Sequence, residues 1–213
     1  MSSFPSTTAY TAGGRTVNLA ALQPDDIDFP AMGEALAKIN RFNGHTTTFY
    51  SVAQHSVLVA SFLPLELRPY GLLHDAHEAF TGDITTPVAN LLKRLGVDNA
   101  IEEMKSRIDR VIFEAANLKW PMEQSVLTQV HKADMRALSA EVRDLLAPPV
   151  SREHDVFANM PPSNVRKIAP MPWVTASVTW LGQLEDCGVY SRAKAAMRQR
   201  RQQMAARKDG SAA

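Results

Sequence analysis

Four side chains of the kinds that bind metal ions are spread along the sequence: His55, the adjacent pair His74 and Asp75, and Asp134. Eighteen residues lie between His55 and His74, and 58 lie between Asp75 and Asp134. Imidazole and carboxylate ligands together suit a divalent ion such as Mn, Fe, Co, Ni or Zn. Two nitrogen and two oxygen ligands can leave positions open for water and a phosphoryl oxygen, as a catalytic metal centre requires.

The surroundings of these residues are apolar. His74 and Asp75 follow Gly-Leu-Leu and precede an alanine, and Asp134 lies four residues from an apolar neighbour on either side. A lone buried aspartate costs several kcal/mol unless it is paired or bound to metal. Taken singly, each of these side chains could be a hydrogen-bonded core residue or an exposed one, and for His55 alone that explanation would be preferred.

Two further carboxylates weaken that ordinary explanation. Glu78 lies four residues after His74 and three after Asp75, which predicts one shared helix face. Asp83 follows the turn Thr-Gly. Two carboxylates beside a metal suit metal-assisted hydrolysis, in which one orients or deprotonates water and the other protonates a leaving group.

The sequence resembles the HD-domain metal-dependent phosphohydrolases over residues 35–145, through Ser-Val-Ala-Gln-His55-Ser, His74-Asp75-Ala-His-Glu78-Ala-Phe-Thr-Gly82-Asp83-Ile-Thr-Thr-Pro87-Val and His-Lys-Ala-Asp134. The likeness is greatest to a compact branch that includes bacterial 5′-deoxynucleotidases and phage deoxynucleoside triphosphohydrolases. The resemblance implies an all-helical fold. It also implies one divalent ion (Co, Mn, Ni, Fe or Zn, with Mg as an alternative) bound by His55, His74, Asp75 and Asp134.

The resemblance also assigns roles around the ion. It makes Glu78 and Asp83 the acid–base pair, without deciding which performs which step. Arg41 matches a family arginine that holds substrate phosphate, a task suited to a planar guanidinium. A basic residue often follows Pro-Val in this branch but is absent here, and Lys93, one turn later, is the candidate replacement. His45 is a further candidate for substrate contact, with a turn-stabilising role as the alternative.

These assignments predict an enzyme, a metal-dependent phosphoric ester hydrolase that converts deoxynucleoside 5′-monophosphates to nucleoside and phosphate. The alternative within the family is a triphosphohydrolase that releases triphosphate whole. A different class is a dinuclear iron oxygenase, which needs additional histidine ligands. Only His77 and His131 lie between the His-Asp pair and the last aspartate, and we expect both at the rim or surface. A third class is a non-catalytic nucleotide-binding protein, against which Glu78 and Asp83 argue.

The elements that position these residues are predicted to be helices, from the spacing of apolar residues. Helices are expected over 27–39, 50–63, 64–80, 85–95, 97–118, 121–146 and 173–184, with a break at Gly188 and a last helix to about residue 207. Asp83 is placed to cap the helix 85–95. We expect an irregular N-terminal arm (1–25) with a short strand near 16–19. One HD-type helical domain (26–190), a long proline-rich loop (147–171) and a basic helical tail (191–213) complete the division.

Composition excludes several classes of protein. The chain of 213 residues is 45% hydrophobic and 21% charged, values that exclude a disordered chain or a coiled coil. No apolar run reaches the roughly 18–20 residues of a membrane-spanning helix, and no signal-peptide core is visible. A single cysteine, Cys187, fits a reducing compartment, so we expect a cytoplasmic protein.

The charge is uneven. From residue 191 onward there are seven Lys/Arg and one acid, which leaves 16 basic and 21 acidic residues before it. A solvated helix end explains this tail better than a phosphate-rich partner does. Basic residues are not interleaved with aromatic ones, so nucleic acid is not the expected partner. We expect a small-molecule nucleotide as substrate, no membrane, and a homo-oligomer that could form through the apolar face of 97–118.

Overall fold

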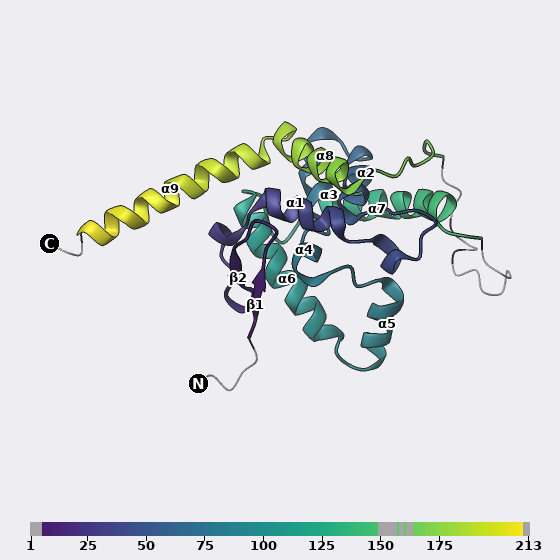
Figure 1. The fold of residues 1–213 in the computed structure, drawn as a ribbon, viewed down its shortest axis with the longest axis horizontal. Coiled ribbons are helices and arrows are strands. Elements are labelled where there is room, and N and C mark those ends of the chain that lie inside the picture. Colours follow the sequence, from purple (N-terminus) through teal and green to yellow (C-terminus); the bar gives the residue numbers. More distant parts are fainter. Residues whose placement is uncertain (1–5, 149–156, 158–159, 161–163, 211–213) are drawn as a thin grey trace.

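The computed structural model describes residues 6–148, 157, 160 and 164–210. Within them the fold is helical apart from one small sheet, which confirms the all-α class (Figure 1). The α-helices are α1 (Phe29–Lys38), α2 (Val52–Ser61), α3 (Arg68–Leu73), α4 (Glu78–Thr81), α5 (Thr86–Arg94), α6 (Asp98–Ala115), α7 (Gln124–Leu145), α8 (Trp173–Asp186) and α9 (Val189–Gly210). The strands β1 (Thr8–Tyr10) and β2 (Thr16–Asn18) pair antiparallel, with Ala9 opposite Val17.

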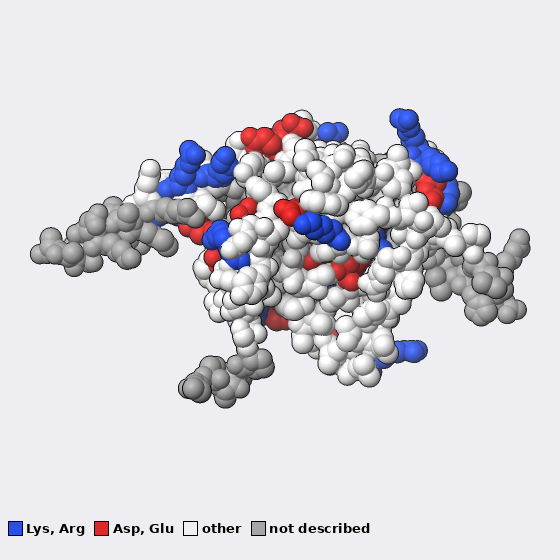
Figure 2. All heavy atoms as spheres, in the orientation of Figure 1, with Lys and Arg blue, Asp and Glu red and all other residues white. Residues whose placement is uncertain are grey.

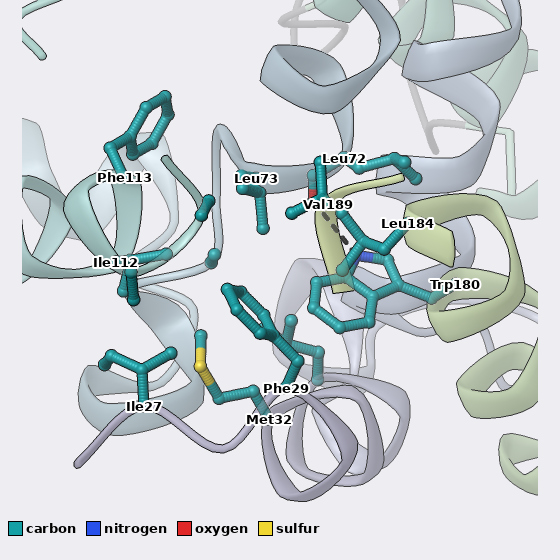
Figure 3. Packing of buried hydrophobic residues seen from close by; sticks show 14 of the residues in the cluster. Ile27, Phe29, Met32, Leu72, Leu73, Ile112, Phe113, Trp180, Leu184 and Val189 are labelled. Carbon is teal, nitrogen blue, oxygen red and sulfur yellow. Dashed lines mark hydrogen bonds between the residues drawn. The ribbon is translucent and has the colours of Figure 1, made fainter. Parts of the chain in front are cut away.

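The main core lies where α1 crosses α8. Phe29 of α1 lies beside the fully buried ring of Trp180 from α8, and Met32 packs on the other side of Phe29 (Figure 3). The Trp180 indole N–H donates a hydrogen bond to the backbone oxygen of Leu72, 2.9 Å away, and so ties α8 to α3. Gly33 permits this approach, because a Cβ there would lie only 2.9 Å from the indole ring.

Close packing of α2 against α3 and α7 brings the predicted ligands together. A Cβ on Gly71 would lie 2.6 Å from the Leu63 side chain and 3.1 Å from the Ala60 Cα atom, so only glycine allows α3 to approach α2 this closely. Helix α7 packs on the other side of α2. Their shared apolar cluster consists of Val59, Leu63, Val130, Ala133 and Ala137.

The single helix predicted over 64–80 is wrong. The segment contains a 3₁₀ turn (Leu65–Leu67), α3, four residues of tight turns (74–77) and then α4. These turns are closed by i to i+3 hydrogen bonds, such as those from Ala76 N–H to Leu73 O and from Glu78 N–H to Asp75 O. The expected cap is wrong as well, because Thr85, and not Asp83, is the residue that precedes α5.

The small N-terminal sheet and the start of α9 both pack onto the helical core. The predicted strand is β2, and the structure adds β1 as its partner; Val17 of β2 is buried in the main core. The predicted break at Gly188 is confirmed, and Ala193 near the start of α9 is still part of the core. Beyond this point α9 runs away from the body of the molecule (Figure 1), and Arg200 forms an ion pair back to Asp25 at 2.6 Å.

The apolar face of α6 packs against the main core of the same chain. Its buried residues belong to the main core and include Ile108, Val111, Ile112, Phe113 and Ala115. The suggestion that this face forms an oligomer interface is therefore wrong for this half of the helix. Most of the predicted loop 147–171 lies outside the described residues. In the part of the chain that the structure describes, no helix has both the length and the apolar character needed to cross a membrane.

Candidate metal centre

The structure brings three of the four predicted metal ligands into one compact group and places the fourth, Asp134, beside His55. Ligand atoms of His55, His74 and Asp75 all lie within 4.8 Å of one another. The His74 Nε2 atom is 3.0 Å and the His55 Nε2 atom 3.5 Å from Asp75 Oδ2, while Asp134 Oδ1 is 3.2 Å from His55 Nε2. Such separations, roughly 3–3.5 Å, are those expected of atoms that share an ion bound at about 2.0–2.2 Å.

Hydrogen bonds behind the two imidazole rings decide which nitrogen faces the cluster. The Nδ1 atom of His74 lies 2.8 Å from the backbone oxygen of Gly71. A carbonyl oxygen can only accept, so this Nδ1 carries a proton. The Nδ1 atom of His55 lies 2.6 Å from a carboxylate oxygen of Glu141. Both rings are thus left with Nε2 as the free ligand atom, and the two Nε2 atoms lie 3.3 Å apart. This donor set fits a divalent transition metal ion.

The charged groups of the cluster strongly shift one another's pKa values. Burial and the charge of Arg41 lower the pKa of His55, but Glu141 and Asp134 outweigh them and raise it to about 10. Burial opposes ionisation of Asp75, yet the two histidines and Arg41 hold its pKa far below the usual range. In the metal-free protein, a proton can therefore occupy the position that an ion would take.

Arg41 lies beside the cluster at the start of a turn with unusual backbone geometry. Its guanidinium is 3.1 Å from Glu141 Oε2 and 3.7 Å from Asp75 Oδ2, and only 13% of its side chain is exposed. The next two residues, Phe42 and Asn43, have φ angles of 55° and 53°. Such left-handed backbone is costly in residues other than glycine and is found where neighbouring structure enforces it, often at functional sites.

Glu78 and Asp83 lie near enough to Arg41 for their charges to raise the pKa of its guanidinium. Burial, followed by the charges of Asp75 and Asp83, raises the pKa of Glu78 to about 9. The Glu78 side chain is buried, and its Oε2 atom has no hydrogen-bond partner among the described residues. Burial also raises the pKa of Asp83, and the charge of Arg41 opposes this rise. Figure 2 shows acidic atoms gathered in a recess at the centre of one face of the molecule.

Two predicted substrate contacts are not brought to the cluster. The side chains of His45 and Lys93 are exposed, and within the described residues neither makes a hydrogen bond or ion pair with a cluster residue. His131 is exposed, as predicted. The surface position predicted for His77 is wrong, because its ring is buried and its Nδ1 atom lies 3.0 Å from a carboxylate oxygen of Asp109 in α6.

Sequence reasoning missed one residue of the site, Glu141. It lies 86 residues from His55 and 100 from Arg41, so no short motif connects them. A signal was nevertheless present: Glu141 follows Asp134 by seven residues, two helical turns that return to the same face. It also follows Ala137 and Ala140, both fully buried.

Comparisons with known proteins give relatives without a described activity. No family model matches the sequence. The chain is 38% identical over 135 residues to the uncharacterized protein YfdR of Escherichia coli K12, an alignment that covers 63% of this chain and 70% of YfdR. It is 27% identical over 179 residues to the uncharacterized protein RCAP_rcc00048 of Rhodobacter capsulatus, covering 78% of this chain and 89% of that protein. By its similarity to YfdR over most of that protein's length, the chain belongs to the YfdR family.

Proposed function

We propose that this protein is a metal-dependent phosphohydrolase of the HD-domain type that hydrolyses deoxynucleoside 5′-monophosphates to nucleoside and phosphate. One observation carries the hydrolase proposal: the convergence of two histidines and two aspartates from three separate segments beside two further carboxylates, Glu78 and Asp83. The nucleotide part rests on the resemblance of residues 35–145 to that family.

The four clustered side chains would hold the ion: His55 and His74 through Nε2, and Asp75 and Asp134 through a carboxylate oxygen. A divalent ion at such a centre acts as a Lewis acid that polarises a phosphoryl oxygen. Arg41 binds and orients the phosphate through its guanidinium, which stands next to Asp75 at the edge of the cluster. Because Asp75 and Glu141 already fix this guanidinium, the substrate meets a preorganised cation.

The two remaining carboxylates divide the proton transfers. Glu78 is buried and holds its proton near neutral pH, so it is suited to protonate the leaving oxygen of the sugar. Burial raises the pKa of Asp83, but the charge of Arg41 opposes this rise and favours the ionised form, so Asp83 is suited to accept a proton from the attacking water. The phosphorus–oxygen bond to the sugar breaks, and the oxygen of water replaces it.

The charge around the cluster favours one phosphoryl group over three. Five carboxylates, those of Asp75, Glu78, Asp83, Asp134 and Glu141, surround a single guanidinium, that of Arg41. Apart from the two histidines that would bind the ion, the described residues pair no second cation with these carboxylates. A triphosphate carries about four negative charges at neutral pH and would be poorly neutralised here. The triphosphohydrolase is therefore the alternative product outcome, and the monophosphatase is the proposal.

The test is a turnover screen with product analysis. The metal-stripped protein would be reloaded with Mn, Co, Ni, Mg or Zn and offered deoxy- and ribonucleoside mono- and triphosphates, with products separated by ion exchange. Orthophosphate from monophosphates supports the proposal. Intact triphosphate as product would replace it with the alternative, and no turnover with any metal would overturn both.

Two variants make the screen specific. Asp75→Ala should lose metal binding and turnover together. Asp144→Asn is the control, because Asp144 is likewise a half-buried aspartate but binds Arg143 and the Ile168 N–H instead of the cluster. Turnover that survives in Asp75→Ala would point to a contaminating enzyme.

A further inference from the structure

Glu141 is a fully buried carboxylate whose two oxygens hold two different functional groups. Its Oε1 atom lies 2.6 Å from His55 Nδ1, and its Oε2 atom lies 3.1 Å from an Arg41 guanidinium nitrogen. None of the Glu141 side chain is exposed. One carboxylate therefore joins a residue of the metal cluster to the cation next to it.

Such a carboxylate is costly unless both oxygens are satisfied. The cost is met here because His55 and Arg41 are themselves buried and each donates a hydrogen bond. An apolar residue of similar size would fill the same space beside Ala137 and Ala140 without any buried charge. Space filling alone thus does not account for a glutamate at this position.

The two bonds have separate consequences. By accepting from Nδ1, Glu141 leaves the Nε2 lone pair of His55 facing Asp134 and Asp75. By accepting from one terminal nitrogen of Arg41, it leaves the other terminal nitrogen 3.7 Å from Asp75 Oδ2. The orientation of the imidazole and the orientation of the guanidinium are therefore set by the same side chain.

We propose that Glu141 is a positioning residue that holds His55 ready for the metal and Arg41 ready for the phosphate, and so keeps the metal and anion positions in register. The inference rests on the metal site of the proposed function. It does not require that nucleotides are the substrate.

The test measures binding, without turnover. Co²⁺ affinity would be measured by titration calorimetry on metal-stripped protein, and inorganic phosphate affinity on the Co²⁺-loaded protein, for the wild type, Glu141→Gln, Glu141→Asp and the control Asp144→Asn. Circular dichroism melts establish that each variant is folded. In Glu141→Gln we expect Co²⁺ affinity to fall about 10–100-fold, the usual effect of losing the partner behind a ligand histidine.

The phosphate measurement separates positioning from charge. Removing a negative charge near the anion would by itself tighten phosphate binding, so weaker binding in Glu141→Gln identifies loss of Arg41 positioning. Glu141→Asp keeps the charge but is one methylene shorter, and we expect it to weaken both affinities too. If Glu141→Gln fails to fold, the Co²⁺ and phosphate affinities of Glu141→Asp alone test the inference.

Two results would overturn the inference: wild-type Co²⁺ affinity in the Glu141 variants, or phosphate binding that is unchanged or tighter in them. Asp144→Asn should retain both affinities. A wild type that binds Co²⁺ and phosphate but hydrolyses no nucleotide would contradict the proposed function alone, so the two failures are distinguishable.

Discussion

His55 and His74 are held from behind by different acceptors, and this difference sets how each competes for a proton. Glu141 and Asp134 raise the pKa of His55 to about 10 against the effects of burial and Arg41. The pKa of His74 is also raised, mainly by Asp75, although burial opposes it. Since only the neutral imidazole binds metal, protons and metal compete for the same Nε2 atoms.

Metal affinity should therefore rise steadily with pH across the neutral range. Both histidines bind a proton below their raised pKa values, so each step up in pH frees more of the ligand form, and the increase should continue up to at least pH 8.5. Co²⁺ titrations at pH 6, 7, 8 and 8.5, with the proton release measured in two buffers, would check this. A flat profile would mean that neither ring is a ligand.

The Glu78→Gln substitution should make the metal-free protein more stable and less active. The pKa of Glu78 is raised to about 9, mainly by burial, from about 4.5 in the unfolded chain, so the folded state binds the extra proton between these values. The contribution to stability is complete below about pH 4.5 and is lost as pH rises toward 9. In metal-free protein at pH 8, Glu78→Gln should raise stability by at least about 1 kcal/mol, or about 2–4 °C in Tm.

The same variant should bind metal normally and lose most turnover, because the neutral amide cannot protonate a leaving group. Glu123→Gln is the control: that side chain is 59% exposed in an ion pair with Lys119, so its Tm should hardly change. Thermal melts at pH 5 and pH 8 are the measurement. A Glu78→Gln protein that is less stable at pH 8 would contradict the assigned environment of Glu78.

Among the elements, the turns between α3 and α4 mark where sequence reasoning fails. Leu72, Ala76 and Phe80 continue a helical period, so the pattern predicts one helix. Over four residues, i to i+3 turns and an α-helix place side chains too similarly for periodicity to separate them. The tighter turns rotate His77 inward against Asp109, a partner 32 residues away that no local pattern reveals.

Other elements could be predicted because proline and glycine residues mark where they begin and end. The predicted helix 85–95 is α5, Thr86–Arg94, with Pro87 in its first turn and Gly96 beyond its end. The clustering of His55 with His74 and Asp75 could also be predicted, because a His-Asp pair in an apolar segment is chemically unusual. Glu141 could not, since an isolated glutamate within a long helix looks like an exposed one until the packing of α7 on α2 is known.

Gly82 ends α4 in a conformation that other residues scarcely adopt, with φ 74° and ψ 166°. It turns the chain so that Asp83 lies near Arg41. Gly82→Ala should therefore cost about 1–3 kcal/mol through backbone strain and should also reduce turnover by displacing Asp83. Urea unfolding and initial rates would measure the two effects.

Gly96→Ala is a matched control for that substitution. Gly96 also has a positive φ, 76°, and open space around its Cα, but it follows α5 away from the cluster. The Gly96→Ala protein should be less stable, but its turnover per folded molecule should be unchanged. Equal loss of turnover in both variants would show that Gly82 acts through general stability and not through Asp83.

At the scale of the whole molecule, α7 links the parts of the site that come from distant segments. Besides Asp134 and Glu141, its last turn accepts the Thr47 N–H on the oxygen of Leu145, at 2.7 Å. One residue earlier, Asp144 accepts the Ile168 N–H at 2.7 Å. The turn that carries Arg41 and the segment that leads into α8 are both tied to the same helix, so the site depends on the folded whole.

Metal loading should consequently stabilise the entire fold. The ligands come from α2, from the turns after α3 and from α7, so an ion cross-links three segments that separate on unfolding. At a free Co²⁺ concentration 100 times its Kd, binding adds about 2.7 kcal/mol, which corresponds to roughly 5–10 °C in Tm for a chain of this size. The shift between loaded and metal-free protein should vanish in Asp75→Ala and persist in Asp144→Asn. Comparing each variant with its own metal-free form cancels the cost of the substitution itself, so an undiminished shift in Asp75→Ala would place the stabilising ion outside this cluster.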